Sequence, residues 1–243
     1  MLTHIKNLFE NPSVQLIETD IHSHLIPGVD DGVETLEEAV EVILALQKLG
    51  YKKLITTPHI MSHRFPNTKE GLLAGLKKLK VALHSREIAI EIEVASEYYV
   101  DEHFLSLLEK GEILTFGKNY LLFELSYAAP LVALEEVVFK IKSAGYTPVL
   151  AHPERYTYWH NQFEQYVVLK ELGVLFQVNA GSLEGFYTSD IAKVAQKLSR
   201  EGMVDFLGSD THRMNYVKAV ERLQHNRLYR DLFKYNTILN HTL

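Results

Sequence analysis

The sequence predicts an α/β fold built around a parallel β-sheet. Segments typical of strands alternate with segments typical of helices along the 243 residues, giving seven strand–helix units, and this alternation is characteristic of parallel sheets. No low-complexity linker interrupts the series, so we expect a single domain over residues 1–243 with its core at about 14–232. The alternation fits either a closed barrel or an open doubly wound sheet.

The first two predicted strands flank a helix whose ends are marked in the sequence. Residues 14–21 (VQLIETDI) form a plausible strand, and KKLITTPH at 52–59 reads as the second. Between them, Thr35 and Glu38 form a capping box, and Gly50 is expected to end the helix. The apolar residues of this helix recur on one face, at Leu36, Ala39, Val40, Ile43 and Leu44.

The remaining elements follow in the same alternation, and glycines mark several helix ends. The further expected strands are 88–97, 120–125, 147–152, 174–179 and 205–210. The further expected helices are 68–86, 101–110, 131–145, about 160–172, 189–200 and 215–232. Gly145 and Gly173 end two of these helices, and Ser189 is expected to cap the helix at 189–200.

Composition argues against several classes of protein. The chain has no cysteine, which excludes disulfides, thiolate metal ligands and a cysteine nucleophile. A net charge of −6 without a basic block does not favour binding of nucleic acid. No apolar run is long enough to cross a membrane, and the first residues lack the apolar core of a signal peptide. We therefore expect a cytoplasmic protein without membrane insertion.

Chemically active side chains recur at the ends of the predicted strands. The stretch TDIHSHLIPGVDDG at 19–32 holds two histidines and two aspartates, and other imidazoles and carboxylates follow later strands. These strand-end residues are His22, His24, His59, Glu97, Glu124, His152, Glu154, Arg155, Asn179, Asp210 and His212. In a barrel the carboxyl ends of the strands converge on one face, where active sites form. One His-x-His pair is weak evidence for a metal site. The repetition of imidazoles and carboxylates at the ends of successive strands, however, is not expected by chance.

Imidazole together with carboxylate suits Zn, Mn or Fe(II). Residues i and i+2 of a strand point to the same side, so His22 and His24 can reach one ion, as can Asp210 and His212. Glu97 or Glu124 could bridge two ions. Mononuclear catalytic zinc needs about three protein ligands, and this surplus of donors predicts two or three metals.

The motifs, in this order, resemble those of the polymerase-and-histidinol-phosphatase (PHP) superfamily. They are HSH at 22–24, TPH at 57–59, Glu97 in ASEYY, AHPER at 151–155 and SDTH at 209–212. Within it, DIHSHLIPGVDDG followed by AHPERY is similar to bacterial PHP-type protein tyrosine phosphatases of the CpsB/YwqE kind, linked to capsular and extracellular polysaccharide synthesis. The resemblance covers residues from about 18 to about 220. It implies a distorted (β/α)7 TIM-like barrel, three divalent metal ions and hydrolysis of phosphotyrosine. Mn2+ is the ion expected, with Fe or Zn as alternatives.

The resemblance also implies roles for individual residues. The positions that match the family's metal ligands are His22, His24, Asp31, His59, Glu97, His152, Asp210 and His212, with Glu124 a shorter match. Arg155 in AHPER matches an arginine that contacts the phosphate. A second family arginine has no clear counterpart here, because Val217 lies roughly where it would fall. Arg213 and Arg64 are candidates for that role.

Several residues allow more than one interpretation. We expect Asp30 to be a turn residue, because Asp-Gly favours tight turns, and His63 to be exposed. An aromatic wall for a substrate ring could come from Tyr98, Tyr99, Tyr156, Tyr158 or Trp159, although such residues pack in cores as often as they bind. Glu154 is left outside the metal site.

The predicted activity is that of a metal-dependent phosphoric monoester hydrolase acting on a phosphotyrosine protein. A bacterial tyrosine kinase tail is the partner that the resemblance implies. Metal ions lower the pKa of bound water, so no side chain need act as nucleophile. The alternatives are a histidinol-phosphate phosphatase, an exonuclease of the same superfamily and a scaffold without activity. The net charge opposes the exonuclease, and the full set of central ligands opposes the scaffold.

Overall fold

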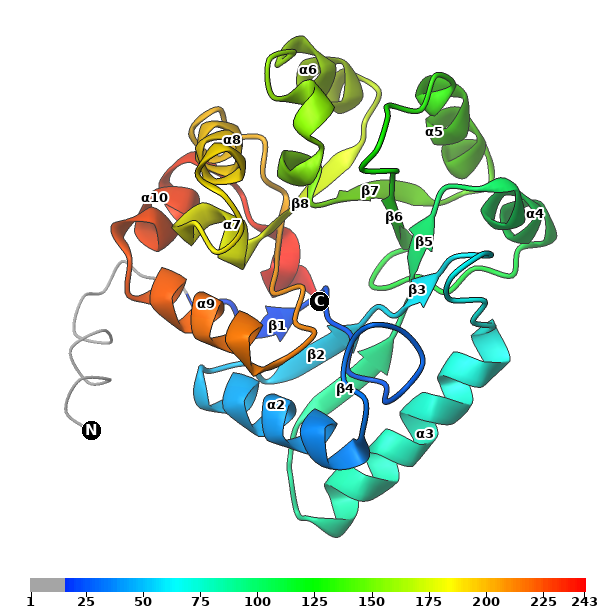
Figure 1. Cartoon of the computed structure of the whole chain (residues 1–243), viewed down its shortest axis with the longest axis vertical. Helices are drawn as coiled ribbons and strands as arrows, with labels where there is room; N and C mark the ends of the chain where they lie inside the picture. Colours follow the sequence, from blue (N-terminus) through cyan, green and yellow to red (C-terminus); the bar gives the residue numbers. More distant parts are fainter. Residues whose placement is uncertain (1–15) are drawn as a thin grey trace.

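The chain folds around a ring of parallel strands with helices outside it (Figure 1). The computed structural model describes residues 16–243, so positions 14 and 15 of the first predicted strand lie outside the described residues. The strands are β1 (Thr19–Asp20), β2 (Lys53–Thr56), β3 (His59–Ile60), β4 (Glu91–Val94), β5 (Glu97–Tyr99), β6 (Tyr120–Glu124), β7 (Thr147–Ala151), β8 (Leu175–Asn179) and β9 (Phe206–Gly208). They form a three-stranded sheet, β1-β2-β4, and a six-stranded sheet, β3-β5-β6-β7-β8-β9.

Two predicted strands, 52–59 and 88–97, are each divided in two. The first gives β2 and β3, and the second gives β4 and β5, with one member of each pair in each sheet. Main-chain hydrogen bonds continue across the breaks, because Ala95 N donates to Thr56 O at 2.9 Å and Glu97 N donates to Thr57 O at 3.3 Å. Pro58 has no N–H to give to a ladder, which interrupts the first of these strands.

The ring closes between the first and last strands. Ser23 and Thr211 form a parallel bridge beyond the ends of β1 and β9. His24 N donates to Thr211 O at 2.9 Å, and Asp210 N donates to His22 O at 2.8 Å. The seven predicted strand positions therefore form a closed, distorted barrel. The predicted (β/α)7 barrel is confirmed, and the open doubly wound sheet is excluded.

Helices cover the outside of the barrel. They are α2 (Leu36–Lys48), α3 (Lys69–Ser85), α4 (Glu102–Lys110), α5 (Leu134–Ser143), α6 (Glu164–Glu171), α7 (Ala180–Glu184), α8 (Ser189–Arg200), α9 (Met214–Gln224) and α10 (Arg227–Tyr235). Thr35 caps α2 as predicted, since its side chain accepts a hydrogen bond from Glu38 N at 3.2 Å. The capping box is incomplete, however, because the Glu38 carboxylate accepts from Glu34 N rather than from Thr35 N.

Two predictions about helices were wrong, and one helix was missed. Thr188, not Ser189, caps α8, because its hydroxyl accepts from Ile191 N at 3.2 Å. The helix predicted at 215–232 is two helices, and Asn226 caps the second by accepting from Leu228 N. The short helix α7 directly after β8 was not predicted. Within residues 16–243, no helix combines the length and the apolar character needed to cross a bilayer.

Apolar side chains fill the barrel below the carboxyl ends of its strands. This inner cluster comprises Ile21, Ile55, Ala95, Phe116, Leu122, Val149, Ala151 and Phe206. The chain returns to the amino end of the barrel in a final turn, Leu239–Thr242, and Figure 1 shows the C-terminus near the centre of the ring. There Asn240 accepts from Leu207 N at 3.0 Å and donates to Thr19 O at 2.9 Å, which joins β1 to β9. One end of the barrel is thereby packed shut, and the polar groups gather at the other.

Candidate metal centre

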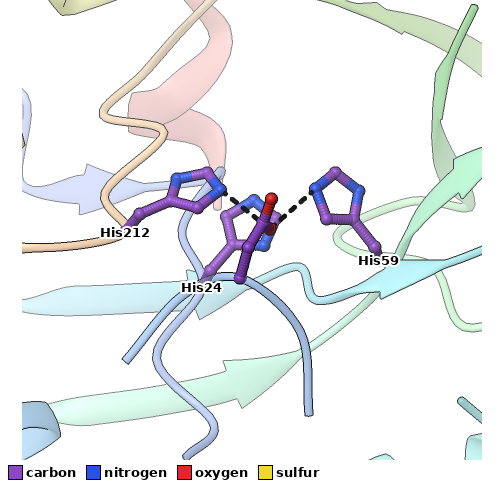
Figure 2. A group of neighbouring side chains, drawn as sticks. His24, His59 and His212 are labelled. Carbon is purple, nitrogen blue, oxygen red and sulfur yellow. Dashed lines mark ion pairs between the residues drawn. The ribbon is translucent and has the colours of Figure 1, made fainter. Parts of the chain in front are cut away.

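The nine predicted ligands meet at the carboxyl end of the barrel. His22 and His24 follow β1, and Asp210 and His212 follow β9. The others come from five further segments: Asp31, His59, Glu97, Glu124 and His152. Figure 2 shows His24, His59 and His212 pointing toward a common point. Most of these side chains are buried, whereas Asp31, His59 and His212 are partly exposed.

The first donor group joins two imidazoles and two carboxylates. His22 Nε2 lies 3.1 Å from Glu97 Oε2 and 3.5 Å from Asp210 Oδ1. His24 Nε2 lies 3.6 Å from each of these oxygens and 3.4 Å from His22 Nε2. Ligand atoms bound at about 2.1 Å to one ion lie about 3.0–3.4 Å apart in octahedral or tetrahedral geometry. The spacing of these four atoms therefore fits a single cation at their centre.

The second donor group joins Glu97 to His152, His59 and Glu124. Glu97 Oε1 lies 2.8 Å from His152 Nε2. On the neighbouring side, His59 Nδ1 lies 3.2 Å from Glu97 Oε2 and 3.1 Å from Glu124 Oε1. Glu97 Oε1 thus faces His152, whereas Glu97 Oε2 faces His22, His24 and His59, so the carboxylate contacts donors on several sides, as a bridging carboxylate must.

The third donor group is at the mouth of the barrel. Asp31 Oδ1 lies 3.5 Å from His59 Nε2 and 3.4 Å from His212 Nε2. Asp31 Oδ1 and His59 Nδ1 are both buried atoms without a hydrogen-bond partner. A buried polar atom without a partner is costly. A cation in the third donor group would satisfy Asp31 Oδ1, and a cation in the second would satisfy His59 Nδ1. The chemistry and spacing of these donors fit metal binding.

Hydrogen bonds from outside the cluster fix the orientation of the histidine rings. His24 Nδ1 pairs with Asp30 Oδ2 at 2.7 Å, and His22 Nδ1 pairs with Gln177 Oε1 at 2.6 Å. His212 Nδ1 pairs with the main-chain oxygen of Asp210 at 2.8 Å. In each case Nδ1 is paired outside the cluster, so Nε2 is the nitrogen that faces the other donors and would bind a cation after losing its proton.

Asp30 is therefore more than the turn residue that we expected. One of its oxygens accepts from Gly32 N, as in an Asp-Gly turn, and the other accepts from His59 N and from His24. Gln177 was not predicted at all. It lies two residues before Asn179 on β8, so the alternation of side chains along that strand was the signal that could have found it.

Opposite charges in the cluster shift the pKa values of its histidines and carboxylates in opposite directions. Burial disfavours a charge on His22, but Glu97 and Asp210 outweigh it and raise the pKa of the imidazole to about 9. Burial likewise opposes the charge on Glu97, yet His22, His59 and His152 hold the pKa of this carboxyl well below its usual range. The ligands thus hold protons in the absence of a cation, and a cation would have to displace them.

Two of the donors have strained backbones. His152 has φ +35° and Asp210 has φ +51°, a region that side chains other than glycine seldom adopt. Such strain persists where the surrounding structure holds it in place, and it concentrates at functional sites. Here it aims two side chains at the cluster directly after β7 and β9.

A pocket of about 300 Å³ opens over the donors. Arg155, Arg213 and Arg64 line it. Arg155 Nη1 donates to Asp210 Oδ2 at 3.1 Å. Arg213 instead donates to Glu34 Oε1 and to Asp31 O, and Arg64 Nη2 lies 3.4 Å from Asp31 Oδ2.

The aromatic residues around the pocket differ from those expected. Tyr98 and Tyr156 are fully buried, and their hydroxyls accept hydrogen bonds from Leu114 N and Leu125 N. Trp159 is also buried, and Tyr158 is outside the pocket. Of the expected residues only Tyr99 lines the pocket, together with the unexpected Phe65, Tyr127 and Tyr216. His63 is exposed as expected.

Glu154 is buried apart from the donors, and its Oε1 accepts from Asn179 N at 2.9 Å. It is not among the clustered donors.

Known proteins resemble this chain over most of its length. It is 28% identical over 202 residues to the tyrosine-protein phosphatase CpsB of Streptococcus agalactiae, covering 81% of this chain and 83% of that protein. It is 25% identical over 194 residues to the tyrosine-protein phosphatase YwqE of Bacillus subtilis, covering 79% of this chain and 76% of that protein.

A solved structure from work on YwqE of Bacillus subtilis and CpsB of Streptococcus pneumoniae, described as metal-dependent tyrosine phosphatases, shares the fold. The TM-score is 0.78 at 22% sequence identity, over 90% of this chain and 96% of that one. The family model for capsular polysaccharide synthesis, CpsB/CapC, matches residues 18–225. The chain therefore belongs to the CpsB/CapC family of capsular polysaccharide synthesis.

Proposed function

We propose that this protein is a metal-dependent phosphatase that hydrolyses phosphotyrosine in proteins. The observation that carries the proposal is the combination of the donor groups with Arg155 in one pocket. The tyrosine-protein phosphatases among its relatives support the same activity. The absence of cysteine from the chain leaves no thiolate nucleophile.

We further propose three divalent ions, with Mn2+ supporting the best activity and Fe or Zn as alternatives. The first would be held by His22, His24, Glu97 and Asp210. The second and third would be held by the remaining predicted ligands, namely Glu124, His152, Asp31, His59 and His212, with Glu97 bridging. When bound, such ions lower the pKa of water and neutralise charge on phosphoryl oxygens.

The protein's own side chains would position the phosphate. Arg155 presents a planar guanidinium that can hydrogen-bond two phosphoryl oxygens, and Asp210 holds it in place. Arg213 is the proposed second contact because it lines the same pocket, although its present partners are Glu34 and the main chain of Asp31. Phenolate is a better leaving group than an alkoxide, which favours an aryl phosphate.

The pocket also suits an aromatic substrate. Phe65, Tyr99 and Tyr216 line it and offer ring surfaces to a phenyl group, which phosphoserine lacks. Because the donors lie at the bottom of a pocket, only a protruding side chain can reach them. We therefore propose a phosphotyrosine in a flexible segment, with the tail of a bacterial tyrosine kinase in polysaccharide synthesis as partner. The cytoplasmic location stays a prediction.

The metal content can be measured directly. Elemental analysis of protein saturated with Mn2+ should give about three ions per chain, and one ion or fewer would contradict the three-ion proposal. The double variant His22→Ala/His24→Ala should lose activity while its circular dichroism stays native, because the apolar barrel interior lies below the site.

Substrate class is tested by comparing kcat/KM on matched phosphotyrosine and phosphoserine peptides, with histidinol phosphate alongside. We expect a clear preference for the phosphotyrosine peptide. Equal rates on the two peptides would refute ring recognition. A preference for histidinol phosphate would make the protein a small-molecule phosphatase instead.

A further inference from the structure

The guanidinium of Arg155 lies between two tyrosine rings. Its Cζ is 4.8 Å from the centroid of the Tyr127 ring and 4.7 Å from that of the Tyr187 ring. Tyr127 comes from the segment between β6 and α5, and Tyr187 from the segment between α7 and α8. Three separate parts of the chain therefore meet at one side chain, and neither tyrosine was singled out by the sequence.

Tyr187 is linked to Arg155 a second time through Asp210. The Tyr187 hydroxyl donates to Asp210 Oδ2 at 3.0 Å, the same oxygen that accepts from Arg155 Nη1 at 3.1 Å. Asn179 Nδ2 donates to this oxygen as well, at 2.7 Å. With Oδ2 so occupied, Oδ1 is the oxygen of Asp210 that faces His22 and His24.

Tyr127 forms the outer wall. It is 44% exposed, lines the pocket and stacks on His152 with ring centroids 5.8 Å apart. The Arg155 side chain beneath it is only 24% exposed. Arginine has many rotamers, and contacts with two rings and with Asp210 restrict Arg155 before any ligand arrives.

We propose that Tyr127 and Tyr187 are positioning residues that preorganise Arg155 for an anionic phosphoryl group. The inference rests on the proposed function. Each tyrosine would act through the guanidinium rather than by touching the substrate. A cation–π contact that is largely shielded from solvent contributes about 1–2 kcal/mol, so loss of one ring should weaken the binding of phosphate by Arg155 by about 5- to 30-fold.

The first experiment separates the ring from the hydroxyl. Tyr187→Phe keeps the ring and loses the bond to Asp210, whereas Tyr187→Leu and Tyr127→Leu lose the ring. With metal-loaded full-length protein, we expect each leucine variant to raise the dissociation constant of inorganic phosphate by about 5- to 30-fold. The dissociation constant of Tyr187→Phe should stay within about 3-fold of the wild-type value, because the ring is kept. Tyr235→Leu, an exposed tyrosine on α10, is the matched control and should have no effect.

The second experiment asks whether the effect passes through Arg155. In the Arg155→Ala background, Tyr187→Leu and Tyr127→Leu should change the dissociation constant of phosphate by less than about 2-fold, because the contact between ring and guanidinium is already absent. An undiminished effect in that background would overturn the proposal and would mean that the rings contact the ligand directly. Loss of bound metal from Tyr187→Leu would also overturn it, since Tyr187 would then act on the metal position through Asp210. Tyr127 does not touch Asp210 but stacks on His152, a proposed metal ligand, so bound metal is measured in Tyr127→Leu as well, and its loss there would equally overturn the proposal.

Phosphate binding also separates this inference from the proposed function. If wild-type protein binds phosphate through Arg155 but does not hydrolyse phosphotyrosine, the proposed function is wrong, whereas the proposal that Tyr127 and Tyr187 position Arg155 is unaffected. If the leucine variants bind phosphate as tightly as wild type does, the positioning proposal is wrong whatever the enzyme hydrolyses.

Discussion

The imidazole of His24 and the carboxylate of Asp30 are joined by a hydrogen bond of 2.7 Å that decides which ring nitrogen faces the barrel. Because Nδ1 donates to Asp30, Nε2 is the nitrogen of His24 that faces the first donor group. Asp30 also accepts from the main-chain nitrogens of Gly32 and His59. One carboxylate thus joins the acidic loop to β3 while it orients a proposed metal ligand.

Replacing Asp30 should weaken metal binding although Asp30 is not itself a proposed ligand. We expect Asp30→Asn to lower metal affinity by about 10- to 100-fold, the usual cost of losing a partner that orients a metal ligand. The measurement is a titration of metal-free protein with Mn2+, followed by activity at saturating metal. Asp190→Ala removes an exposed aspartate on α8 and should leave affinity unchanged. Unaltered affinity in Asp30→Asn would show that the bond does not orient His24.

Arg155→Ala should remove the main phosphate contact. We expect kcat/KM on p-nitrophenyl phosphate to fall by about 10²-fold or more, the scale of one lost transition-state donor. Arg155→Lys should restore only part of this, because lysine lacks the planar fork. Arg213→Ala should have a smaller effect, since its guanidinium is shared with Glu34. If Arg213→Ala were the more damaging of the two, the order of these contacts would be reversed.

Gly208 is crowded by the side chains that support the site. A Cβ at this position would lie 2.5 Å from Gln177 Nε2 and 2.7 Å from His22 Cβ. Gly208→Ala should therefore cost about 1–3 kcal/mol of stability and lower kcat/KM by about 10-fold or more, because a ligand and its partner must shift.

The comparison for Gly208 is Gly111→Ala. Gly111 has φ +69° and open space around it, so alanine there costs stability through the backbone alone. Both variants should unfold at lower urea concentration, but only Gly208→Ala should lose activity. Full activity in Gly208→Ala would mean that His22 and Gln177 tolerate the displacement.

Glu154 gives a pH dependence of stability with a definite sign. Burial raises the pKa of its carboxyl, and Oε2 has no hydrogen-bond partner while Oε1 accepts from Asn179 N. The folded protein holds this proton after the unfolded chain has released it, so Glu154 destabilises the fold progressively as pH rises above the unfolded pKa of about 4.3. Glu154→Gln lacks this titration. Its free energy of unfolding, relative to that of wild type, should therefore rise between about pH 4.5 and pH 7, by the amount that one titrating carboxyl contributes.

Urea denaturation of both proteins at several pH values measures this difference. Glu154→Ala is the comparison, because it removes the acceptor for Asn179 N and leaves a cavity, and it should be less stable than Glu154→Gln throughout. A constant difference between Glu154→Gln and wild type across this range would contradict the assignment.

The sequence by itself determined the alternation of strands and helices, the chemistry of the donors and their place at strand ends. These are local properties: the period of apolar residues, the caps at Thr35 and Gly50, and the i, i+2 spacing of His22 and His24. The prediction of one domain stays a prediction, as does the role of each ligand. Local signals failed at Thr188 and Ser189, because either of these neighbouring residues could cap the helix. They also failed near Pro58, where the predicted strand divides between two sheets.

Only the tertiary structure decided which side chains face each other across the barrel. Closure between Ser23 and Thr211 brings Asp210 against His22, although the two are far apart in the chain. The same closure assigns roles that no short stretch of sequence encodes. Asp30 and Gln177 orient imidazoles. Tyr98 and Tyr156 are buried, with their hydroxyls bonded to main-chain nitrogens, and are not exposed to substrate. The physical reason is that a motif specifies residue types and their spacing along one strand. Contacts between strands depend on register, on the direction in which the ring closes and on which buried polar groups find partners.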